Sequence, residues 1–350
     1  MLASVAAILA FATACVVALI AVPIAARVAR RTGFLDQPVG YKRHGHPTPY
    51  LGGSAVVLAF VVVAIAFGAG SGRFLAVVLG AVALWVVGTI DDRVNLSPLL
   101  RVGVTIAAAV GLWAEDLGWN VFDAAALDLG LTIVWVVGLV NAFNLMDNLD
   151  GATGSVAAAS SVGIGAFALV NDDAALAALS FGLVGACLGF LRSNLARPAR
   201  IFLGDGGSMP VGFVIAAMAI AAPRVAEMGN EAVLIAALLT GLVILDTTLV
   251  VISRRRHGVP LLTGGRDHLT HRLLGIVGSA RRVAGTLATA QLGLCALALA
   301  AASLGRSAVL AVAILVGAAG LGAIAWLERR MDRHHAEAST LSGNVAPARE

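Results

Sequence analysis

Apolar residues in this chain form long runs, and polar residues are concentrated in the short segments between these runs. A membrane-spanning helix needs about 20 mostly apolar residues, and eleven runs are candidates for such helices. The pattern predicts an all-α, polytopic integral membrane protein with about eleven transmembrane helices, ten being the alternative count. The expected spans are residues 2–26, 51–70, 74–90, 99–113, 131–144, 152–170, 174–191, 209–222, 232–252, 283–304 and 308–327.

Composition narrows the class of protein. The chain is 59% hydrophobic and 13% charged, whereas soluble domains are about 45–50% apolar and about 25% charged, so a soluble multi-domain enzyme is excluded. Only two tyrosines are present, both in one loop, which disfavours a transmembrane β-barrel with its aromatic girdles. Each of the three cysteines lies inside an apolar run and is expected to be a small buried hydrophobe. The first run is too long for a signal peptide and no basic residue precedes it, so we expect it to remain as a span.

The orientation in the membrane follows from lysine and arginine, which accumulate in cytoplasmic loops. With the N-terminus outside, the inner segments hold 21 of the 24 basic residues, and only Arg73, Arg224 and Arg306 lie outside. The sequence therefore predicts a C-terminus in the cytoplasm. We expect one transmembrane domain over residues 1–327, followed by a disordered cytoplasmic tail over residues 328–350.

The densest polar patterns all fall in segments expected on the cytoplasmic face. The first segment contains Lys42 in a Lys-Arg-His run, then Pro-Thr-Pro, then Gly52 and Gly53. Basic residues followed by rigid turns and paired glycines suit a loop close to a phosphate or nucleotide. The positive-inside bias by itself also predicts basic residues here, so this segment is weak evidence alone.

Two adjacent carboxylates, Asp91 and Asp92, stand at the cytoplasmic end of the third span. The negative end of the helix dipole makes carboxylates at a helix C-terminus unfavourable by a few tenths to about 1 kcal/mol each. This cost favours a site for Mg²⁺ or for a cationic partner over a solvated turn at the membrane surface.

A second polar cluster stands where the fifth span meets the same face. Four amide or carboxylate side chains recur there at every third position: Asn141, Asn144, Asp147 and Asp150. A stripe with this spacing drifts by about 60° per step around a helix, so we expect the helix to end near residues 148–151. Polar side chains at membrane depth are typical of a functional site, and a hydrogen-bonded seam between helices is the structural alternative.

A glycine-rich turn precedes the eighth span. It has the sequence Phe-Leu-Gly-Asp-Gly-Gly-Ser over residues 202–208. Backbone N–H groups at the start of the following helix can face an anion, while Asp205 can hold a hard cation through oxygen. A single Gly-Asp-Gly is weak evidence, and its position on the same face as the two acidic clusters strengthens it.

A basic loop over residues 253–282 completes the set. His268 and His271 are three residues apart, but zinc is disfavoured because the loop has no cysteine and Asp267 is the only nearby carboxylate. Imidazole and guanidinium groups suit a diphosphate better. Asp246, nearer the inner end of the ninth span, is the one clear charged residue inside a span.

Acidic residues, glycines that let the backbone approach a phosphate, and a basic loop are the components of phosphoryl transfer. That reaction depends on positioning and charge neutralisation more than on a protein nucleophile, and the membrane setting indicates a lipid substrate. A transporter of anionic solutes is the alternative from another class. Proton-coupled transporters place ionisable residues near the bilayer midplane, whereas the spans here are almost free of charge.

The order of these motifs resembles the polyprenyl-phosphate N-acetylhexosamine-1-phosphate transferases, a superfamily that includes phospho-N-acetylmuramoyl-pentapeptide transferase. The matching motifs extend from Asp36 to Arg272: the acidic pair, N-x-x-N-x-x-D-x-x-D-G, G-D-x-G-S and H-x-x-H. The resemblance implies transfer of an N-acetylhexosamine 1-phosphate from a UDP-sugar to undecaprenyl or another polyprenyl phosphate, with Mg²⁺ or alternatively Mn²⁺. The products would be a polyprenyl-diphosphate sugar and UMP. This is the first membrane step of a cell-envelope polysaccharide, placed by the resemblance on the cytoplasmic side of a bacterial inner membrane.

The resemblance also implies roles for single residues. Asp91, Asp92 and Asp205 would be catalytic, and Asp205 and Asn144 would hold the metal. The second pKa of a phosphate monoester is about 6, so the lipid phosphate is already mostly dianionic at neutral pH, which favours positioning by Asp91 over deprotonation. The substrates would be bound by Lys42, Arg101 (near the lipid phosphate, where relatives usually carry Lys), Asn144, Asp147 and Asp150 (nucleotide), Phe202 (uracil), and His268, His271 and Arg272 (diphosphate).

Three departures from the family pattern leave the donor sugar open. Asn148 stands where relatives commonly have glycine, Thr270 stands where the N-acetylglucosamine branch has histidine, and the triple histidine of the muramoyl-pentapeptide branch is absent. UDP-N-acetylglucosamine is the expected donor, with UDP-N-acetylmuramoyl-pentapeptide and a relative whose site has decayed as alternatives. The expected partners are the UDP-sugar, polyprenyl phosphate and the membrane, without nucleic acid, and a homodimer is allowed.

Overall fold

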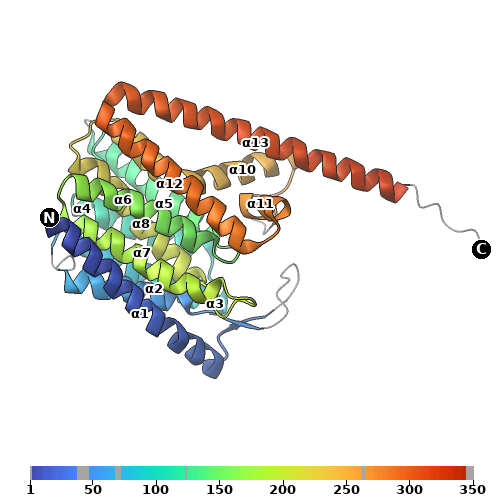
Figure 1. The fold of residues 1–350 in the computed structure, drawn as a ribbon, viewed down its shortest axis with the longest axis horizontal. Coiled ribbons are helices and arrows are strands. Elements are labelled where there is room, and N and C mark those ends of the chain that lie inside the picture. Colours follow the sequence, from blue (N-terminus) through green and yellow to red (C-terminus); the bar gives the residue numbers. More distant parts are fainter. Residues whose placement is uncertain (1, 38–46, 68–71, 123, 262–264, 344–350) are drawn as a thin grey trace, which may run out of the picture.

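The computed structural model describes residues 2–37, 47–67, 72–122, 124–261 and 265–343, so Lys42 lies outside the described residues. Most of the described chain is helical, and the only described strands are two short ones that pair antiparallel (Figure 1). The elements are α1 Leu2–Thr32, β1 Leu35–Asp36, β2 Thr48–Pro49, α2 Gly52–Ala66, α3 Leu75–Val94, α4 Pro98–Ala114, α5 Ala125–Met146, α6 Ala152–Val170, α7 Ala174–Asn194, α8 Asp205–Val225, α9 Ala232–Leu239, α10 Gly241–His257, α11 Leu269–Val277, α12 Ala280–Leu304 and α13 Arg306–Gly343.

The predicted all-α, multi-pass architecture is confirmed. Within the described part of the chain, eight helices are long and apolar enough to cross a membrane, and the bent pair α9–α10 would make a ninth. Helices α2 and α4 are shorter apolar helices that overlap the second and fourth expected spans. The count of eleven spans and the side on which each terminus lies remain predictions.

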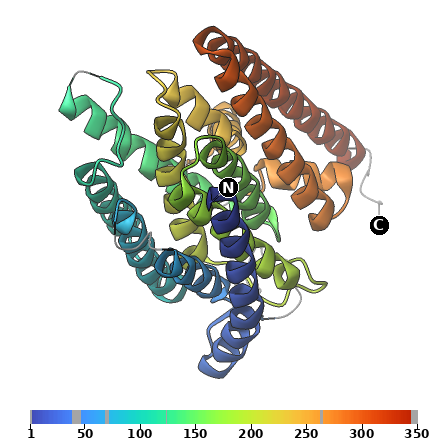
Figure 2. The same cartoon turned by 60° about the vertical axis from the view of Figure 1, so that its left-hand side comes forward.

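Helix α8 forms the core of the bundle, because its residues are buried without interruption from Gly206 to Pro223. Helices α2, α3, α5 and α6 all pack against it. Glycines permit this close packing: a Cβ atom at Gly80 of α3 would overlap the ring of Phe213 on α8. Figure 2 shows the blue helices α3 and α4 on one side of the bundle and the orange-red helices α12 and α13 on the opposite side.

Helix α1 packs along α7 through small residues. A Cβ atom at Gly189 of α7 would come within 2.6 Å of the Ala18 Cβ atom, and one at Gly185 would overlap the backbone of Phe11. Such small-residue contacts let helices approach closely where lipid removes the usual hydrophobic driving force. The buried residues of α1 form a stripe of seven alanines and one valine: Ala3, Ala7, Ala10, Ala14, Ala18, Val22, Ala26 and Ala29.

The expected span over residues 232–252 is not one straight helix, because α9 and α10 meet at 80°. Gln291 of α12 is fully buried and satisfies the backbone groups at the break. Its Oε1 atom accepts from the Leu242 N–H at 3.0 Å, and its Nε2 atom donates to the Leu239 and Leu238 carbonyls at 2.8 and 3.2 Å. A broken helix at membrane depth needs such partners, since lipid offers none.

Helix α13 continues as one element from Arg306 to Gly343 and extends beyond the rest of the bundle (Figure 1). The expected boundary at residue 327 therefore falls inside a helix. Glu328, the first residue of the expected disordered tail, is 2% exposed. The start of the tail is thus ordered and packed in this structure.

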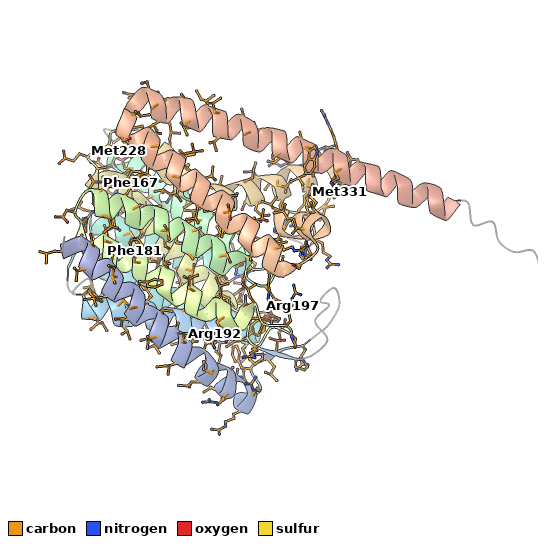
Figure 3. The ribbon with its side chains drawn as sticks, viewed as in Figure 1. Phe167, Phe181, Arg192, Arg197, Met228 and Met331 are labelled. Atoms are coloured by element: carbon orange, nitrogen blue, oxygen red, sulfur yellow. The ribbon has the colours of Figure 1, made fainter. Side chains whose placement is uncertain are left out.

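The two ends of the bundle differ in chemistry. Figure 3 shows Met228 and Phe167 toward one end of the bundle and Arg192 and Arg197 at the opposite end. The arginine-bearing end also carries β1, β2 and α11 (Figure 1), and we refer to it as the polar end. The predicted site residues in the described chain lie at helix ends and turns of this polar end.

Replacing Gln291 by Leu should destabilise the protein, because three backbone groups at the α9–α10 break would lose their partner. We expect a loss of about 2–4 kcal/mol, measured as a lower midpoint of thermal unfolding in detergent. Leu292→Ala is a matched control, since Leu292 is the next residue of α12 and is 41% exposed. Equal midpoints for the two variants would show that the amide does not hold the break.

Candidate active site

Helices α3, α4, α5 and α8 bring charged and amide side chains together at the polar end. The predicted helix ends explain this meeting, because α3 and α5 finish where α8 begins. We call the following set the acidic cluster: Asp91 and Asp92 of α3, Arg101 of α4, Asn144 of α5 and Asp205 of α8.

Asp92 caps the N-terminus of α8 from another helix. Its Oδ1 atom accepts from the Asp205 N–H at 2.9 Å, and its Oδ2 atom accepts from the Gly206 N–H at 3.0 Å. The positive end of the α8 dipole therefore offsets the charge that is unfavourable at the end of α3. These N–H groups were expected to face a substrate anion, and that expectation is wrong because the protein's own carboxylate accepts from two of them.

Two glycines make this contact between α3 and α8 geometrically accessible. Gly204 has a φ of +73°, and a Cβ atom there would come within 2.5 Å of Asp92 Oδ2. A Cβ atom at Gly88 of α3 would overlap the backbone of Asp205. A larger residue at either position would push the two helix ends apart.

Asp205 and Asp91 share one guanidinium nitrogen. Arg101 Nη1 donates to Asp91 Oδ2 at 2.7 Å and to Asp205 Oδ2 at 3.1 Å. The Asp91 side chain is 7% exposed and that of Asp205 is 28% exposed. Charges with reduced hydration interact more strongly than charges in water, so the guanidinium of Arg101 stabilises this pair of carboxylates.

Asn144 fixes the other oxygen of Asp205. Its Nδ2 atom donates to Asp205 Oδ1 at 2.7 Å and to the Ser208 hydroxyl at 3.0 Å. Ser208 is fully buried one turn into α8, so it anchors the amide against that helix. The amide carbonyl of Asn144 remains as a hard oxygen donor beside Asp205.

The residues of the acidic cluster fit Mg²⁺. Carboxylate and amide oxygens are ligands that this ion prefers, and it is usually held by one or two carboxylates together with substrate phosphates. Among the described residues no group of three or more His, Cys, Asp or Glu side chains could hold a metal by itself. The arrangement therefore suits an ion that is completed by phosphate oxygens, with Asp205 and Asn144 as the protein's donors.

Asp147 lies beside this cluster, at the end of α5. Burial and the neighbouring Asp92 carboxylate raise the pKa of Asp147 to about 7, although a hydrogen bond from the Gly204 backbone acts in the opposite direction. Asp150 follows in the turn that leads to α6, as the spacing predicted. Both carboxylates are half-buried at the polar end, and their contact with a nucleotide remains a prediction.

The segment that carries Asp205 is held by backbone contacts with the first loop. Gly52 N–H donates to the Phe202 carbonyl at 3.0 Å, and Phe202 N–H donates to the Pro49 carbonyl at 2.8 Å. The Phe202 ring meets the Tyr50 ring edge-on with centroids 6.2 Å apart. Phe202 is thus fixed at the polar end, and its contact with uracil remains a prediction.

Asn194 is a buried positioning residue that sequence reasoning did not assign to the site. Its Oδ1 atom accepts from the Gly151 N–H at 2.6 Å, and its Nδ2 atom donates to the Ile201 carbonyl at 3.0 Å. It therefore ties the turn after Asp150 to the segment before Asp205. A polar residue at the inner end of an apolar run was the available signal.

His268 is oriented by Asp246, the one clear charge inside an expected span. Asp246 is fully buried, and its Oδ2 atom lies 2.9 Å from His268 Nδ1. Its Oδ1 atom accepts from the Leu269 N–H at 2.6 Å, so it also caps α11. A carboxylate on Nδ1 leaves the other ring nitrogen for a ligand, and the predicted contact of His268 with a diphosphate remains a prediction.

Arg272 is held by three partners rather than standing free in the basic loop. Its Nε atom donates to the Asp267 carbonyl at 3.0 Å, and its Nη2 atom lies 2.9 Å from Ser253 Oγ and 2.6 Å from Glu328 Oε1. Glu328 comes from α13, beyond the last expected span. Its role could not be found from sequence because an acidic residue after a span is usually solvated.

Two of the departures from the family pattern contact each other. The Thr270 hydroxyl donates to the Asn148 side-chain oxygen, and Asn148 Nδ2 donates to the Leu145 carbonyl at 2.6 Å. This hydrogen bond connects α11 to the turn that follows α5. It joins the basic loop to the end of the helix that bears Asn144.

The fold and the site define a multi-pass membrane protein that gathers carboxylates, an amide and a guanidinium at one end of a helical bundle, an arrangement suited to phosphoryl transfer. Residues 74–222 match the family model described as glycosyl transferase family 4. The chain is 30% identical to a Bacillus subtilis protein named "Probable undecaprenyl-phosphate N-acetylglucosaminyl 1-phosphate transferase", over 76% of this chain and 77% of that protein.

Two further relatives carry related names. The decaprenyl-phosphate N-acetylglucosaminephosphotransferase of Mycolicibacterium smegmatis is 33% identical over 73% of this chain and 72% of its own length. The undecaprenyl-phosphate alpha-N-acetylglucosaminyl 1-phosphate transferase of Escherichia coli is 28% identical over 71% of each chain. The chain belongs to glycosyl transferase family 4, among its polyprenyl-phosphate N-acetylhexosamine-1-phosphate transferases, and is a phosphotransferase.

Asp92→Ala should lower the stability of the folded protein, because the Asp205 and Gly206 N–H groups would lose their acceptor. We expect a loss of about 1–3 kcal/mol, seen as a lower thermal midpoint in detergent. Asp205→Ala is the comparison, since it removes a carboxylate from the same cluster without uncapping α8. The capping role is contradicted if Asp205→Ala loses as much stability as Asp92→Ala.

Asp147→Asn should stabilise the metal-free protein increasingly as pH rises. The raised pKa of Asp147, about 7, means that the unfolded chain releases this proton at lower pH than the folded protein, so wild-type stability falls as pH rises toward that value. The difference in midpoint between variant and wild type should therefore grow from about pH 5 to about pH 8. Glu115→Gln, at an exposed position, is the control. A difference that does not vary with pH would contradict burial of an ionisable group at Asp147.

Proposed function

We propose that the protein transfers N-acetylglucosamine 1-phosphate from UDP-N-acetylglucosamine to a polyprenyl phosphate in a bacterial membrane. The reaction forms a P–O bond between the lipid phosphate and the sugar-bearing phosphorus, breaks the bond to the nucleotide, and releases UMP. It would take place on the cytoplasmic side, and its product would start a cell-envelope polysaccharide. The names of the relatives support the lipid acceptor and the N-acetylglucosamine group.

The main support for this proposal is that Arg101 Nη1 donates to both Asp91 and Asp205, while Asn144 donates to the second oxygen of Asp205. Two carboxylates at the membrane surface would repel phosphates unless cations accompany them. When bound, Mg²⁺ would supply charge neutralisation at the diphosphate and would be held by Asp205 and Asn144. Arg101, which lies between the two carboxylates, would neutralise a phosphate oxygen on the acceptor.

The geometry supports a positioning role for Asp91. Both of its carboxylate oxygens are already engaged, one by the Leu96 N–H and the other by Arg101. A carboxylate that holds a guanidinium in this way orients the cation, and the acceptor phosphate needs little help in losing a proton at neutral pH. Asp91 would therefore act through Arg101.

The direct test is transfer of radiolabelled sugar from UDP-N-acetylglucosamine to undecaprenyl phosphate by the purified protein with Mg²⁺. We expect a lipid-linked product and an equal amount of UMP, with loss of both after chelation of the metal. Asp205→Asn should lower the rate at least about 100-fold, the usual effect of removing a group that stabilises transition-state charge. Glu115→Gln, at an exposed position, should be as active as the wild type.

The donor is tested in the same assay with a panel of UDP-sugars. We expect UDP-N-acetylglucosamine to be the best substrate, ahead of UDP-N-acetylgalactosamine and UDP-N-acetylmuramoyl-pentapeptide. Preference for the muramoyl-pentapeptide donor would contradict the proposed sugar. Absence of any metal-dependent lipid product with the whole panel would contradict the reaction itself.

A further inference from the structure

A cavity lined by three arginines lies between the basic loop, helix α11 and the end of α13 that extends past the bundle. It has a volume of about 240 Å³. Figure 3 shows Met331 of α13 beside α11 at this place. The side chains that carry its chemistry are Arg266, His271, Arg272, Leu327, Arg330 and Met331.

Two buried nitrogen atoms at this cavity have no hydrogen-bond partner among the described residues. The Arg272 side chain is 7% exposed, and its Nη1 atom is buried without a hydrogen-bond partner among the described residues. The Nδ1 atom of His271 is buried and unpartnered in the same way. Unsatisfied buried donors are rare and costly in proteins, so Arg272 Nη1 points to an acceptor. The nearby Glu328 Oε1 atom lies against the other nitrogen, Nη2, and is itself buried without a hydrogen bond among the described residues.

One carboxylate, Glu328, lies against an arginine of this cavity, and it is shared with an arginine outside the cavity. Glu328 lies 2.6 Å from Arg272 and is shared with Arg256, whose Nη1 atom donates to it at 2.8 Å. In the described part of the chain, Arg266 and Arg330 form no ion pair with a carboxylate, and Arg330 lies over the Trp326 ring at 5.7 Å. Positive charge is therefore in excess at this place.

We propose that this cavity binds a phosphoryl group and that the extended end of α13 completes it. Arg330 would be a further binding residue, acting with Arg266 and the free nitrogen of Arg272. Guanidinium groups match the oxygens of a phosphate in charge and geometry. Glu328 joins α13 to Arg272 and so brings Arg330 to the cavity.

The apolar side chains of Leu327 and Met331 at the same cavity allow the phosphate to be part of a larger molecule. The phosphate could come from the diphosphate of a nucleotide-linked donor or from a lipid headgroup. Binding of the donor's diphosphate would rest on the proposed function. Binding of a phosphate group as such does not rest on it. The experiment therefore measures binding without turnover.

The first arm titrates inorganic pyrophosphate into the purified full-length protein by calorimetry, without divalent metal. Arg330→Gln should raise the dissociation constant about fivefold to tenfold, since one charge-assisted contact is lost. Arg266→Gln should have a similar effect. Arg329→Gln is the matched control, because Arg329 is the adjacent exposed residue of α13 and does not line the cavity. Equal pyrophosphate binding by Arg330→Gln and Arg329→Gln would overturn the proposal, whether or not the protein transfers sugar phosphate.

The second arm identifies the source of the phosphate with the same two variants. A matching loss of affinity for UDP in Arg330→Gln, but not in Arg329→Gln, would assign the cavity to the nucleotide diphosphate. Unchanged affinity for UDP, together with reduced retention of phosphatidylglycerol from mixed vesicles, would assign it to a lipid headgroup. If Arg330→Gln binds both UDP and phosphatidylglycerol as the wild type does, the proposal is overturned.

Discussion

The site depends on one interaction: the first two N–H groups of α8 donate hydrogen bonds to the carboxylate of Asp92. It joins the end of α3 to the start of the most deeply buried helix, and it places Asp205 at the polar end. The charge of Asp92 and the dipole of α8 offset each other at short range. Gly88 and Gly204 are required for this approach, because any Cβ atom there would meet the partner helix end.

The cluster built on this contact brings three carboxylates, Asp91, Asp92 and Asp205, together with one guanidinium. Arg101 offsets part of their negative charge because it lies between Asp91 and Asp205. A hard cation with phosphate oxygens would offset the rest. The basic loop is organised separately: Asp246 orients His268, and Glu328 holds Arg272. Buried acidic partners thus orient His268 and Arg272 of the basic loop, apart from the acidic cluster.

The sequence predicted the helices and the helix ends that carry Asp91, Asn144 and Asp205, because membrane spans are set by apolar length and polar residues collect where spans end. It did not predict the break at Thr240, since the apolar run continues through it and only the tertiary contact with Gln291 reveals it. The capping by Asp92 and the burial of Glu328 also depend on contacts between segments far apart in the chain, which residue patterns do not encode.

We propose that Asp205, positioned by Asp92 and paired with Asn144, holds the divalent cation that neutralises the diphosphate. Electron paramagnetic resonance of Mn²⁺ added to the purified protein with UDP measures this directly, because bound and free ions give different signals. We expect a bound ion in the wild type, no bound ion in Asp205→Asn, and a bound ion in Glu115→Gln. Binding of Mn²⁺ by Asp205→Asn with the affinity of the wild type would contradict it.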